Sequence, residues 1–286
     1  MSSPALSSVY ENFYYTNYCG MAYERNAHWL GFFGDIATKI VARIAPKSSL
    51  DAGCAWGFLV ESLRDRGVQA FGLDHSAYAI GQVRSDIQPY CAVGSITEPF
   101  PQRYDLITCI EVLEHLPVLD VERAVANLCA HTDDIIFSST PYHYDDATHL
   151  NVRPPDYWAE LFAYQGFFRD VDFDASFLSP WAVRYRRNSE PAARIVAAYE
   201  RRLWHLEKDN QGQHQACLAQ QQQLADQAKQ IADLQEQIAN PQRVAELLAE
   251  KDRVIAQLHG QLQDITQSAG WKLLQVLWKL RRRLLP

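Results

Sequence analysis

The sequence predicts an α/β protein with a doubly wound sheet, an N-terminal helical lid and a C-terminal coiled coil. Between residues 46 and 187, short apolar runs alternate with amphipathic stretches, which is typical of parallel strands joined by crossover helices. After residue 187 glutamine becomes abundant and apolar residues recur every seven positions, which is typical of a coiled coil. We expect four parts: a lid (1–45), the α/β domain (46–187), a linker and coiled coil (188–268), and a basic amphipathic helix (269–286).

The N-terminal segment is crowded with aromatic residues. Nine of them lie between residues 10 and 33. Buried aromatic side chains usually pack in a core, so one interpretation is a helix pair that packs on the edge of the sheet. The other is a lid that covers a bound ligand.

The strands and helices of the α/β domain follow from apolar runs and amphipathic periods taken in chain order. Strands are expected at 49–52, 69–73, 90–93, 104–110, 134–139, 167–173 and 181–186. Helices are expected at 57–66, 77–85, 120–130 and 155–165.

The turn after the first strand indicates a pocket for a nucleotide cofactor. The apolar run ends at Asp51, and small residues follow at Gly53, Ala55 and Gly57. Small residues let the backbone approach a ligand closely. The next strand ends at Asp74, and the ends of neighbouring parallel strands lie side by side. Its carboxylate therefore faces the turn and can accept hydrogen bonds from both hydroxyls of a ribose.

The spacing of the glycines argues against a dinucleotide cofactor. A dinucleotide fingerprint requires G-x-G-x-x-G, whereas this turn has Gly53, Ala55, Gly57 and then Phe58. An adenosine ligand without phosphates needs no cradle of backbone amides for a pyrophosphate. S-adenosyl-L-methionine meets that description.

Two motifs resemble the class I S-adenosylmethionine-dependent methyltransferases. The run SLDAGCAWGFL with Asp74 is similar to motif I and the acid that follows it, and RYDLITCIEVLEHLP is similar to the "FDLV…EVLEHL" segment of that family. The similarity covers about residues 45–175 and extends to bacterial methyltransferases of surface-polysaccharide (O-antigen or capsule) biosynthesis. It implies a Rossmann-like seven-stranded methyltransferase sheet, with the last strand antiparallel, and S-adenosyl-L-methionine as the cofactor.

The resemblance also implies a set of cofactor-binding residues. They are Asp51, Gly53, Cys54, Ala55, Gly57, Asp74, His75, Ser95, Ile96 and Glu111. The chain departs from the family in two places: Ala55 replaces the usual central glycine, and the turn at Ser95 lacks the usual acid near the adenine. A backbone amide or Ser95 would then meet the adenine amine. In the lid, tyrosine hydroxyls or Arg25 would reach the methionine carboxylate.

Four histidines are candidates for the catalytic base: His143 and His149, then His115, which more often packs under the loop, and His75, which more often borders the adenine. Transfer to an alcohol requires removal of its proton, and a histidine is suited to accept it. His143 and His149 follow the fifth strand at its carboxyl end, where ligands bind in such sheets. Similarity of residues 148–158 to a family motif favours His149. The alternative is a histidine that only ties the loop to a carboxylate such as Asp145. The histidines and cysteines lack zinc-site spacing, so no metal is predicted, and Asp145-Asp146 is only a weak hint of a divalent ion.

The C-terminal region carries two helical patterns. Apolar residues recur in heptads on either side of Asn240-Pro241, a pair that predicts an N-cap followed by proline at the first helical position. We expect a homo-oligomer formed through the coiled coil; the alternative is an amphipathic helix folded back on the catalytic domain. The last helix combines Trp271 and Trp278 with lysines and arginines, which favours an anionic membrane surface or, alternatively, an acidic protein partner.

Composition narrows the class of function. The net charge of −7 combines +5 in residues 271–286 with −12 in the rest, and such an acidic body argues against a nucleic-acid partner. The six cysteines form no C-x-x-C pair, and no apolar run is long enough for a membrane span or a signal peptide. We expect a cytoplasmic enzyme, peripheral on the inner face of the membrane.

The predicted function is O-methylation of a sugar hydroxyl on a surface polysaccharide or a lipid-linked glycan precursor. Two alternatives stay open. One is a scaffold with a methyltransferase fold that recruits other enzymes without catalysing transfer. The other is methylation of a small soluble metabolite.

Overall fold

The computed structural model describes residues 12–17, 21–142, 144 and 146–284. The chain divides into two compact units, Met1–Trp204 and His205–Pro286. Each is described by itself.

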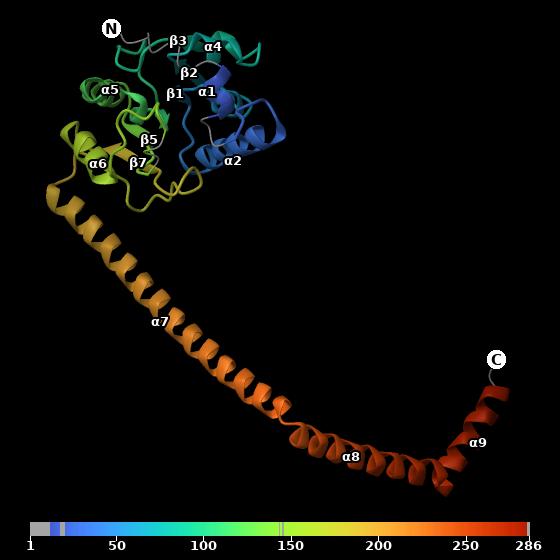
Figure 1. The fold of residues 1–286 in the computed structure, drawn as a ribbon. Helices are drawn as coiled ribbons and strands as arrows, with labels where there is room; N and C mark the ends of the chain where they lie inside the picture. Colours follow the sequence, from blue (N-terminus) through green and yellow to red (C-terminus); the bar gives the residue numbers. More distant parts are fainter. Residues whose placement is uncertain (1–11, 18–20, 143, 145, 285–286) are drawn as a thin grey trace. The chain divides into compact units, whose positions relative to one another are not determined.

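The first unit contains a seven-stranded sheet with the order β3-β2-β1-β4-β5-β7-β6 (Figure 1). The strands are β1 (Ser48–Ala52), β2 (Gln69–Asp74), β3 (Cys91–Val93), β4 (Leu106–Ile110), β5 (Asp134–Ser138), β6 (Phe167–Arg169) and β7 (Val183–Arg187). Strands β1 to β5 pair in parallel, while β7 pairs antiparallel with both β5 and β6. The predicted Rossmann-like α/β fold with an antiparallel last strand is confirmed.

The strand order reverses between β1 and β4, which are neighbours in the sheet although two strands separate them in the chain. At such a switch point the connections leave in opposite directions, and a crevice opens outside the carboxyl ends of the two strands. Asp51 of β1 lies opposite Thr108 of β4 in the register. The loops that follow these two strands therefore line the expected ligand crevice.

Helices cover both faces of the sheet. The helices of this unit are α1 (Asn12–Asn17), α2 (Ala27–Arg43), α3 (Phe58–Arg64), α4 (Ala77–Gly81), α5 (Val118–Ala130) and α6 (Pro155–Tyr164), with short 3₁₀ turns η2 (Gln88–Tyr90) and η3 (Leu113–His115). One core layer joins α2, α3 and α4 to the sheet, and the other joins α5 and α6 to the opposite face (Figure 1). The burial of these apolar faces fixes the sheet that carries the site.

The described part of the second unit is helical. It comprises most of α7 (Ala192–Ala239), which begins in the first unit, with α8 (Pro241–Gln267) and α9 (Ala269–Leu284). The side chain of Asn240 accepts hydrogen bonds from the backbone N–H groups of Gln242 and Arg243, and Pro241 takes the first helical position. This confirms the predicted N-cap.

The heptad residues of these helices are exposed in the single chain. Leu224 and Ile231 of α7 are 61% and 56% exposed, and neither α7 nor α8 has a buried residue among those described. An apolar stripe of this kind gains stability only when another surface covers it. The coiled coil and the oligomer stay predictions.

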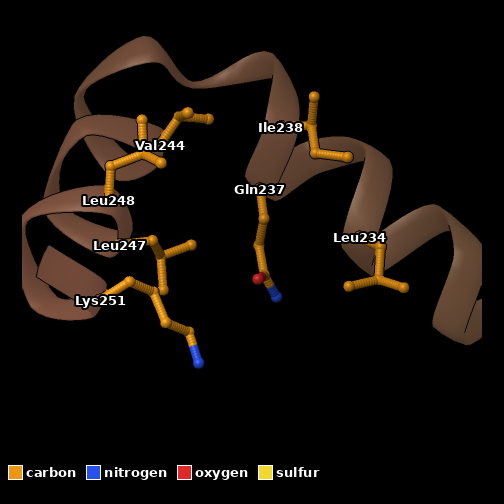
Figure 2. A pocket seen from close by; sticks show the side chains of 7 residues that line it. All are labelled: Leu234, Gln237, Ile238, Val244, Leu247, Leu248 and Lys251. Carbon is orange, nitrogen blue, oxygen red and sulfur yellow. The ribbon is translucent and has the colours of Figure 1, made fainter. Parts of the chain in front are cut away.

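An apolar pocket of about 250 Å³ lies at the turn between α7 and α8 (Figure 2). Its lining residues are Leu234, Gln237, Ile238, Val244, Leu247, Leu248 and Lys251. None of the predicted cofactor or catalytic residues belongs to it. No helix in the described part of the chain combines the length and the apolar character needed to cross a bilayer.

Candidate cofactor and acceptor site

The turn after β1 depends on glycine at two positions. Gly53 and Gly57 have φ angles of +89° and +70°, a region that glycine adopts without the steric cost of a Cβ atom. A Cβ atom on Gly53 would lie 2.3 Å from Cγ2 of Val112, far inside van der Waals contact. The N–H groups of Gly53 and Cys54 both donate to the carbonyl oxygen of Leu73, at 2.7 and 3.0 Å. The Cys54 side chain is buried under the turn.

Asp74 faces this turn, as the sequence predicts. Its Oδ2 accepts a hydrogen bond of 2.7 Å from the N–H of Ala55, and its Oδ1 accepts one of 2.8 Å from the N–H of Ser76. Burial raises the pKa of Asp74, while these two N–H groups favour the ionised form and oppose the shift. The carboxylate is thus positioned by backbone amides at the edge of the turn.

Ala55 has a left-handed backbone conformation, with φ of +48°. A side chain in this region carries a steric cost that glycine does not have. Its N–H group nevertheless reaches Asp74, so the replacement of glycine by alanine preserves the geometry of the turn.

Asp51 lies below the turn and not at its rim. The residue is 6% exposed, and the hydroxyl of Thr108 donates to its Oδ1 at 2.7 Å. Burial is the main cause that raises the pKa of Asp51 to about 7, and the hydrogen bond from Thr108 opposes the shift. Asp51 therefore links β1 to β4 at the switch point.

The predicted adenine-side residues lie at the ends of β2 and β3. The N–H of Gly94 donates to the carbonyl oxygen of Asp74 at 2.9 Å, which brings the loop containing Ser95 beside the predicted ribose-binding acid. The hydroxyl of Ser95 lies 2.7 Å from that of Thr97, and Ile96 is buried. His75 is exposed. Ser95 and Ile96 therefore share a loop beside Asp74, while His75 is on the surface.

The aromatic N-terminal segment packs over the turn. The rings of Tyr15 and Tyr23 lie 5.7 and 5.6 Å from that of Trp56, and all three belong to an aromatic cluster that also touches Ala55. The aromatic segment packs against the candidate cofactor turn, which fits both interpretations, so the lid stays a prediction. Residues 1–11 and 18–20 of this segment lie outside the described residues, so the calls that fall on them stay predictions.

Arg25 pairs with a buried carboxylate of α3. Its guanidinium donates to both carboxylate oxygens of Glu61, at 2.8 and 2.6 Å. Glu61 is 6% exposed, so the ion pair compensates a buried charge on α3. In this structure that carboxylate occupies the guanidinium, and the expectation that Arg25 binds the methionine carboxylate stays a prediction.

Glu111 follows β4 in a left-handed conformation, with φ of +52°. Its Oε1 accepts a hydrogen bond of 2.8 Å from the indole N–H of Trp181, and its N–H donates to the carbonyl oxygen of Ser138. A non-glycine residue at positive φ is held there by its surroundings, and such positions concentrate at functional sites. Trp181, which the sequence places only in a strand pattern, positions this carboxylate.

His149 is nearly buried beside another histidine. Its side chain is 8% exposed, its Nε2 lies 3.5 Å from Oδ2 of Asp146, and its ring centre is 4.7 Å from that of His115. The sequence expected a loop carboxylate such as Asp145 near a histidine; the structure places Asp146 there. His143 and Asp145 lie outside the described residues, so the assignment of His143 stays a prediction.

His115 is held from two sides. Its Nδ1 lies 3.1 Å from the carbonyl oxygen of Thr148, and its Nε2 lies 3.3 Å from the hydroxyl of Tyr14. Burial is the main cause that lowers the pKa of His115 to about 4, so the ring is neutral near pH 7. Sequence reasoning missed Tyr14 and Thr148, because a contact between an N-terminal helix and a distant loop leaves no local pattern.

Glu114 completes this group of side chains. It is fully buried, and the N–H of Thr140 contacts its Oε1 at 3.4 Å. Burial and repulsion from Glu111 raise the pKa of Glu114 well above its ordinary range. One ligand-type atom each from Glu114, His115 and His149 lies within 4.8 Å of the others. The spacing rules did not reveal this set, because it combines an adjacent Glu-His pair with a distant histidine.

Val112 joins the two halves of the site. Its side chain fills the space above Gly53, and Glu114 follows it two residues further along the chain. The structure therefore brings Gly53, Ala55, Asp74 and the group around His149 to the same edge of the sheet, at the switch point.

The fold and this edge define an α/β protein that binds a nucleoside-containing cofactor. The turn leaves no room for a side chain at Gly53, and Asp74 offers a carboxylate at the end of the adjacent strand. Both features fit S-adenosylmethionine, which has a ribose but no phosphate. A family model described as a methyltransferase domain matches residues 23–231, more than half of the chain. The chain belongs to this family of class I S-adenosylmethionine-dependent methyltransferases.

Curated relatives match parts of the chain. It is 37% identical over 107 residues to a ubiquinone biosynthesis O-methyltransferase of Serratia proteamaculans (strain 568), covering 34% of this chain and 44% of that protein. The protein of the same name from Nitrosospira multiformis (strain ATCC 25196 / NCIMB 11849 / C 71) is 32% identical over 134 residues, covering 44% of this chain and 51% of that protein. The chain spans about half the length of the curated relatives it matches.

Solved structures of other methyltransferases are also similar. An amino pentose methyltransferase from Micromonospora echinaspora, solved with bound S-adenosylmethionine, has a TM-score of 0.47 at 16% identity, covering 57% of this chain and 93% of that chain. The magnesium protoporphyrin IX methyltransferase from Synechocystis PCC 6803 has a TM-score of 0.46 at 17% identity, covering 56% of this chain and 83% of that chain.

Proposed function

We propose that this chain transfers a methyl group from S-adenosylmethionine to a hydroxyl group of a small molecule. The observation that carries the proposal is the group of Glu114, His115 and His149, which lies beside the cofactor turn at the switch point of the sheet. The name O-methyltransferase in the matched relatives also supports an oxygen acceptor.

The site has the elements that such a transfer needs. When bound, S-adenosylmethionine supplies a methyl group on a sulfonium, and a neutral thioether remains after transfer. The residues of this chain have to align the acceptor, exclude water and assist the loss of the hydroxyl proton. The aromatic cluster of Tyr15, Tyr23 and Trp56 packs against the turn. Tyr14, which packs against that cluster, has its ring centre 5.9 Å from that of His115.

A transfer assay with the full chain tests this function. We would incubate the protein with labelled S-adenosylmethionine and panels of catechols, other phenols and free sugars, and identify methyl ethers by mass spectrometry. Calorimetric titration with the cofactor, beside the variant Asp74→Ala, tests the pocket separately. Loss of the ribose-binding carboxylate is expected to weaken binding by about 10- to 100-fold.

Two results would contradict the proposal. The absence of cofactor binding at millimolar concentration to folded protein would favour the scaffold alternative. Methylation at nitrogen or carbon, with no product from any hydroxyl acceptor, would contradict the reaction class.

A sugar hydroxyl on a lipid-linked glycan or a surface polysaccharide is the second candidate acceptor. The feature that favours it is α9, whose exposed side chains include Trp271, Leu274 and Trp278 and whose sequence carries five basic residues. Tryptophan and basic residues on one helix suit an anionic membrane surface, where such precursors reside. On this candidate the enzyme is peripheral on the cytoplasmic face of the membrane.

Sedimentation with vesicles distinguishes the two acceptor classes. If α9 serves a membrane-bound acceptor, the full chain binds vesicles rich in phosphatidylglycerol, and the double variant Trp271→Ser/Lys272→Glu binds them more weakly. If the acceptor is a soluble metabolite, turnover is the same with and without vesicles.

Sedimentation equilibrium of the full chain beside Ile231→Asp tests the homo-oligomer, because Ile231 lies in the predicted heptad seam.

A further inference from the structure

One face of α7 repeats a pattern every seven residues along almost the whole helix. The repeat runs from Val196 to Ile238, which is six heptads of a single uninterrupted helix. In heptad notation, position a carries Val196, Leu203, Asn210, Cys217, Leu224, Ile231 and Ile238, and position d carries Tyr199, Leu206, Gln213, Gln220, Gln227 and Leu234. All of these side chains are exposed in the single chain. A seven-residue repeat of this length is typical of helices that wind around each other, so this seam of α7 requires a helical partner.

The seam continues across the turn into α8. Its apolar a and d positions there are Val244, Leu248, Ile255, Leu258, Leu262 and Ile265. The pocket of about 250 Å³ at the turn is lined by Leu234 and Ile238 of α7 and by Val244 and Leu248 of α8 (Figure 2). The seams of the two helices therefore meet in one apolar hollow. A hollow between core positions is the feature that receives a side chain of the facing helix when knobs pack into holes.

The charges beside the seam fit a second copy of the same helix that runs in parallel. In a parallel pair, position g of one chain faces position e of the next heptad of the other, and opposite charges there select the partner and its direction. Arg202 lies at position g and Glu207 at the following e, so this ion pair forms twice in a symmetric dimer. An antiparallel pair would place both charges beside the second half of α7, whose e and g positions from residue 216 on carry only glutamine and alanine.

Asn210 fixes the register of the pair. A single asparagine at position a sets the register and the number of strands, because its amide is buried in the seam and requires a hydrogen-bond partner. In a parallel pair in register, the two copies of Asn210 lie in one layer, and each offers an N–H donor and a carbonyl acceptor to the other. A shift by one heptad would place Asn210 against Leu203 or Cys217, neither of which satisfies the amide.

The apolar core positions favour two strands. In parallel coiled coils, β-branched residues at a combined with leucine at d favour a dimer. The seam has Val196, Ile231 and Ile238 at position a, and Leu206 and Leu234 at position d. These residues lie toward the two ends of α7, and the polar layers lie between them.

We propose that α7 pairs with α7 of a second copy of this chain as a parallel, two-stranded coiled coil in register. Asn210 then faces its own copy, and so does Cys217 in the next layer of a positions. The apolar hollow at the turn between α7 and α8 receives seam side chains of the second chain. The inference goes beyond the predicted homo-oligomer in strand number, direction and register, and it does not depend on which acceptor is methylated.

Parallel pairing brings both copies of α9 to the same end of the coil, because α8 and α9 follow α7 in each chain. Each copy of α9 carries five basic residues. An anionic surface would then meet two linked sites, and the second contact forms at a high effective concentration once the first has formed. The pair therefore strengthens binding through α9 without any new contact, which an antiparallel pair cannot do.

Disulfide formation between single cysteines in the full chain tests the direction and the register. In a background of Cys19→Ser and Cys217→Ala, the cysteines left among the described residues are all buried. Ile231→Cys or Leu224→Cys then adds one thiol to the seam. Copper phenanthroline and dioxygen serve as the oxidant, which takes two electrons as two thiols lose their protons and the S–S bond forms.

We expect both seam variants to form a covalent dimer. A disulfide requires Cα atoms within about 7 Å, and in a parallel pair in register each of these residues faces its own copy. An antiparallel pair over the same six heptads would place residue 231 beside residue 203 of the other chain and separate the two copies of residue 231 by about 42 Å.

Gln215→Cys in the same background is the matched control. Gln215 lies on the same helix but at position f, on the face opposite to the seam, so this variant should stay monomeric on a non-reducing gel. The wild-type chain should form the same covalent dimer through Cys217, and the background variant should not.

Sedimentation equilibrium of the full chain measures the number of strands. The wild type should sediment as two chains. Asn210→Val removes the amide that specifies the pairing, so this variant should give a mixture of two-chain and larger species. Circular dichroism checks that each variant keeps its helical content.

Each outcome supports or overturns the inference. A two-chain species in which Ile231→Cys and Leu224→Cys form disulfides while Gln215→Cys does not supports it. A two-chain species in which neither seam cysteine forms a disulfide overturns the parallel register. A single chain overturns the pairing, and three chains overturn the strand number. All of these outcomes leave the proposed methyl transfer intact, because cofactor binding and turnover are measured separately.

Discussion

The cofactor turn (residues 53–57) and the group of Glu114, His115 and His149, called the Glu-His group below, lie next to each other but are built in different ways. The turn is shaped by its backbone: Gly53 and Gly57 have positive φ angles, and the N–H of Ala55 donates to Asp74. The Glu-His group instead converges side chains from separate segments, His149 from one loop and His115 from another. A backbone site depends on a few conformations, whereas a side-chain site depends on long-range packing.

This difference changes what a substitution does. In the turn, an added Cβ atom disturbs the backbone and therefore both folding and cofactor binding. In the Glu-His group, removal of a ring leaves the backbone in place and should affect only what the ring binds. Variants at the two places should therefore separate stability from activity.

Gly53→Ala should have the largest effect. The new Cβ atom would lie 2.3 Å from Val112 at a φ of +89°, and the two costs together destabilise the fold by roughly 2–5 kcal/mol. Cofactor binding should be lost as well. Urea denaturation measures the first effect and calorimetry the second.

Gly31→Ala is the matched control for this change. A Cβ atom on Gly31 in α2 meets nothing within 4 Å, so the same substitution should be neutral or stabilise by up to about 1 kcal/mol through helix propensity. Equal destabilisation by both variants would mean that Val112 does not limit the turn.

His149→Ala should reduce turnover with little change in stability. Loss of proton-transfer assistance lowers the rate by about 10²- to 10⁴-fold. Affinity for S-adenosylmethionine should be unchanged, because His149 packs against Asp146 and His115, whereas the cofactor turn is held by Gly53, Ala55 and Asp74. Steady-state kinetics and calorimetry measure the two quantities. A loss of cofactor affinity as large as the loss of rate would contradict the separation of the two halves.

The same difference explains how far the sequence could predict the molecule. The seven strands, the antiparallel closing strand and the facing of Asp74 toward the turn were predictable, because apolar periods and glycine spacing are local patterns. The partner of Arg25 was not predictable, since Arg25 lies before α2 and Glu61 lies on α3. The contacts of His115 with Tyr14 and Thr148 likewise join distant segments. Such contacts depend on tertiary packing, which short sequence patterns do not encode.

Asp51 links β1 to β4 beneath the cofactor turn and the Glu-His group, and the pH dependence of stability tests this link. Its pKa is raised from an ordinary value of 3.8 to about 7, so the folded state favours the protonated acid. The preference of the fold for the protonated acid contributes to stability in full at pH values below the ordinary pKa of 3.8. The contribution is lost as the pH rises through about 7. A shift of this size corresponds to at most about 4 kcal/mol.

Asp51→Asn should therefore become more stable relative to wild type as pH rises. Asparagine can still accept the hydrogen bond from Thr108 but carries no charge. Urea denaturation at about pH 5 and about pH 8 measures the difference, which should be larger at the higher pH. A difference that does not change with pH would show that Asp51 is ionised in the fold at both values.

Ala55→Gly should have the smallest effect and gives the finest comparison within the turn. Ala55 has φ of +48° and Ala45, outside the site, has φ of +52°. Glycine relieves the steric cost at either position, but it also increases the entropy of the unfolded chain, so each gain is at most about 1 kcal/mol. The methyl group of Ala55 also packs against the aromatic cluster over the turn. Thermal denaturation should therefore show a smaller gain for Ala55→Gly than for Ala45→Gly, and cofactor affinity should be preserved in both because the N–H to Asp74 remains. A larger gain at residue 55 would mean that the aromatic segment does not use this methyl group.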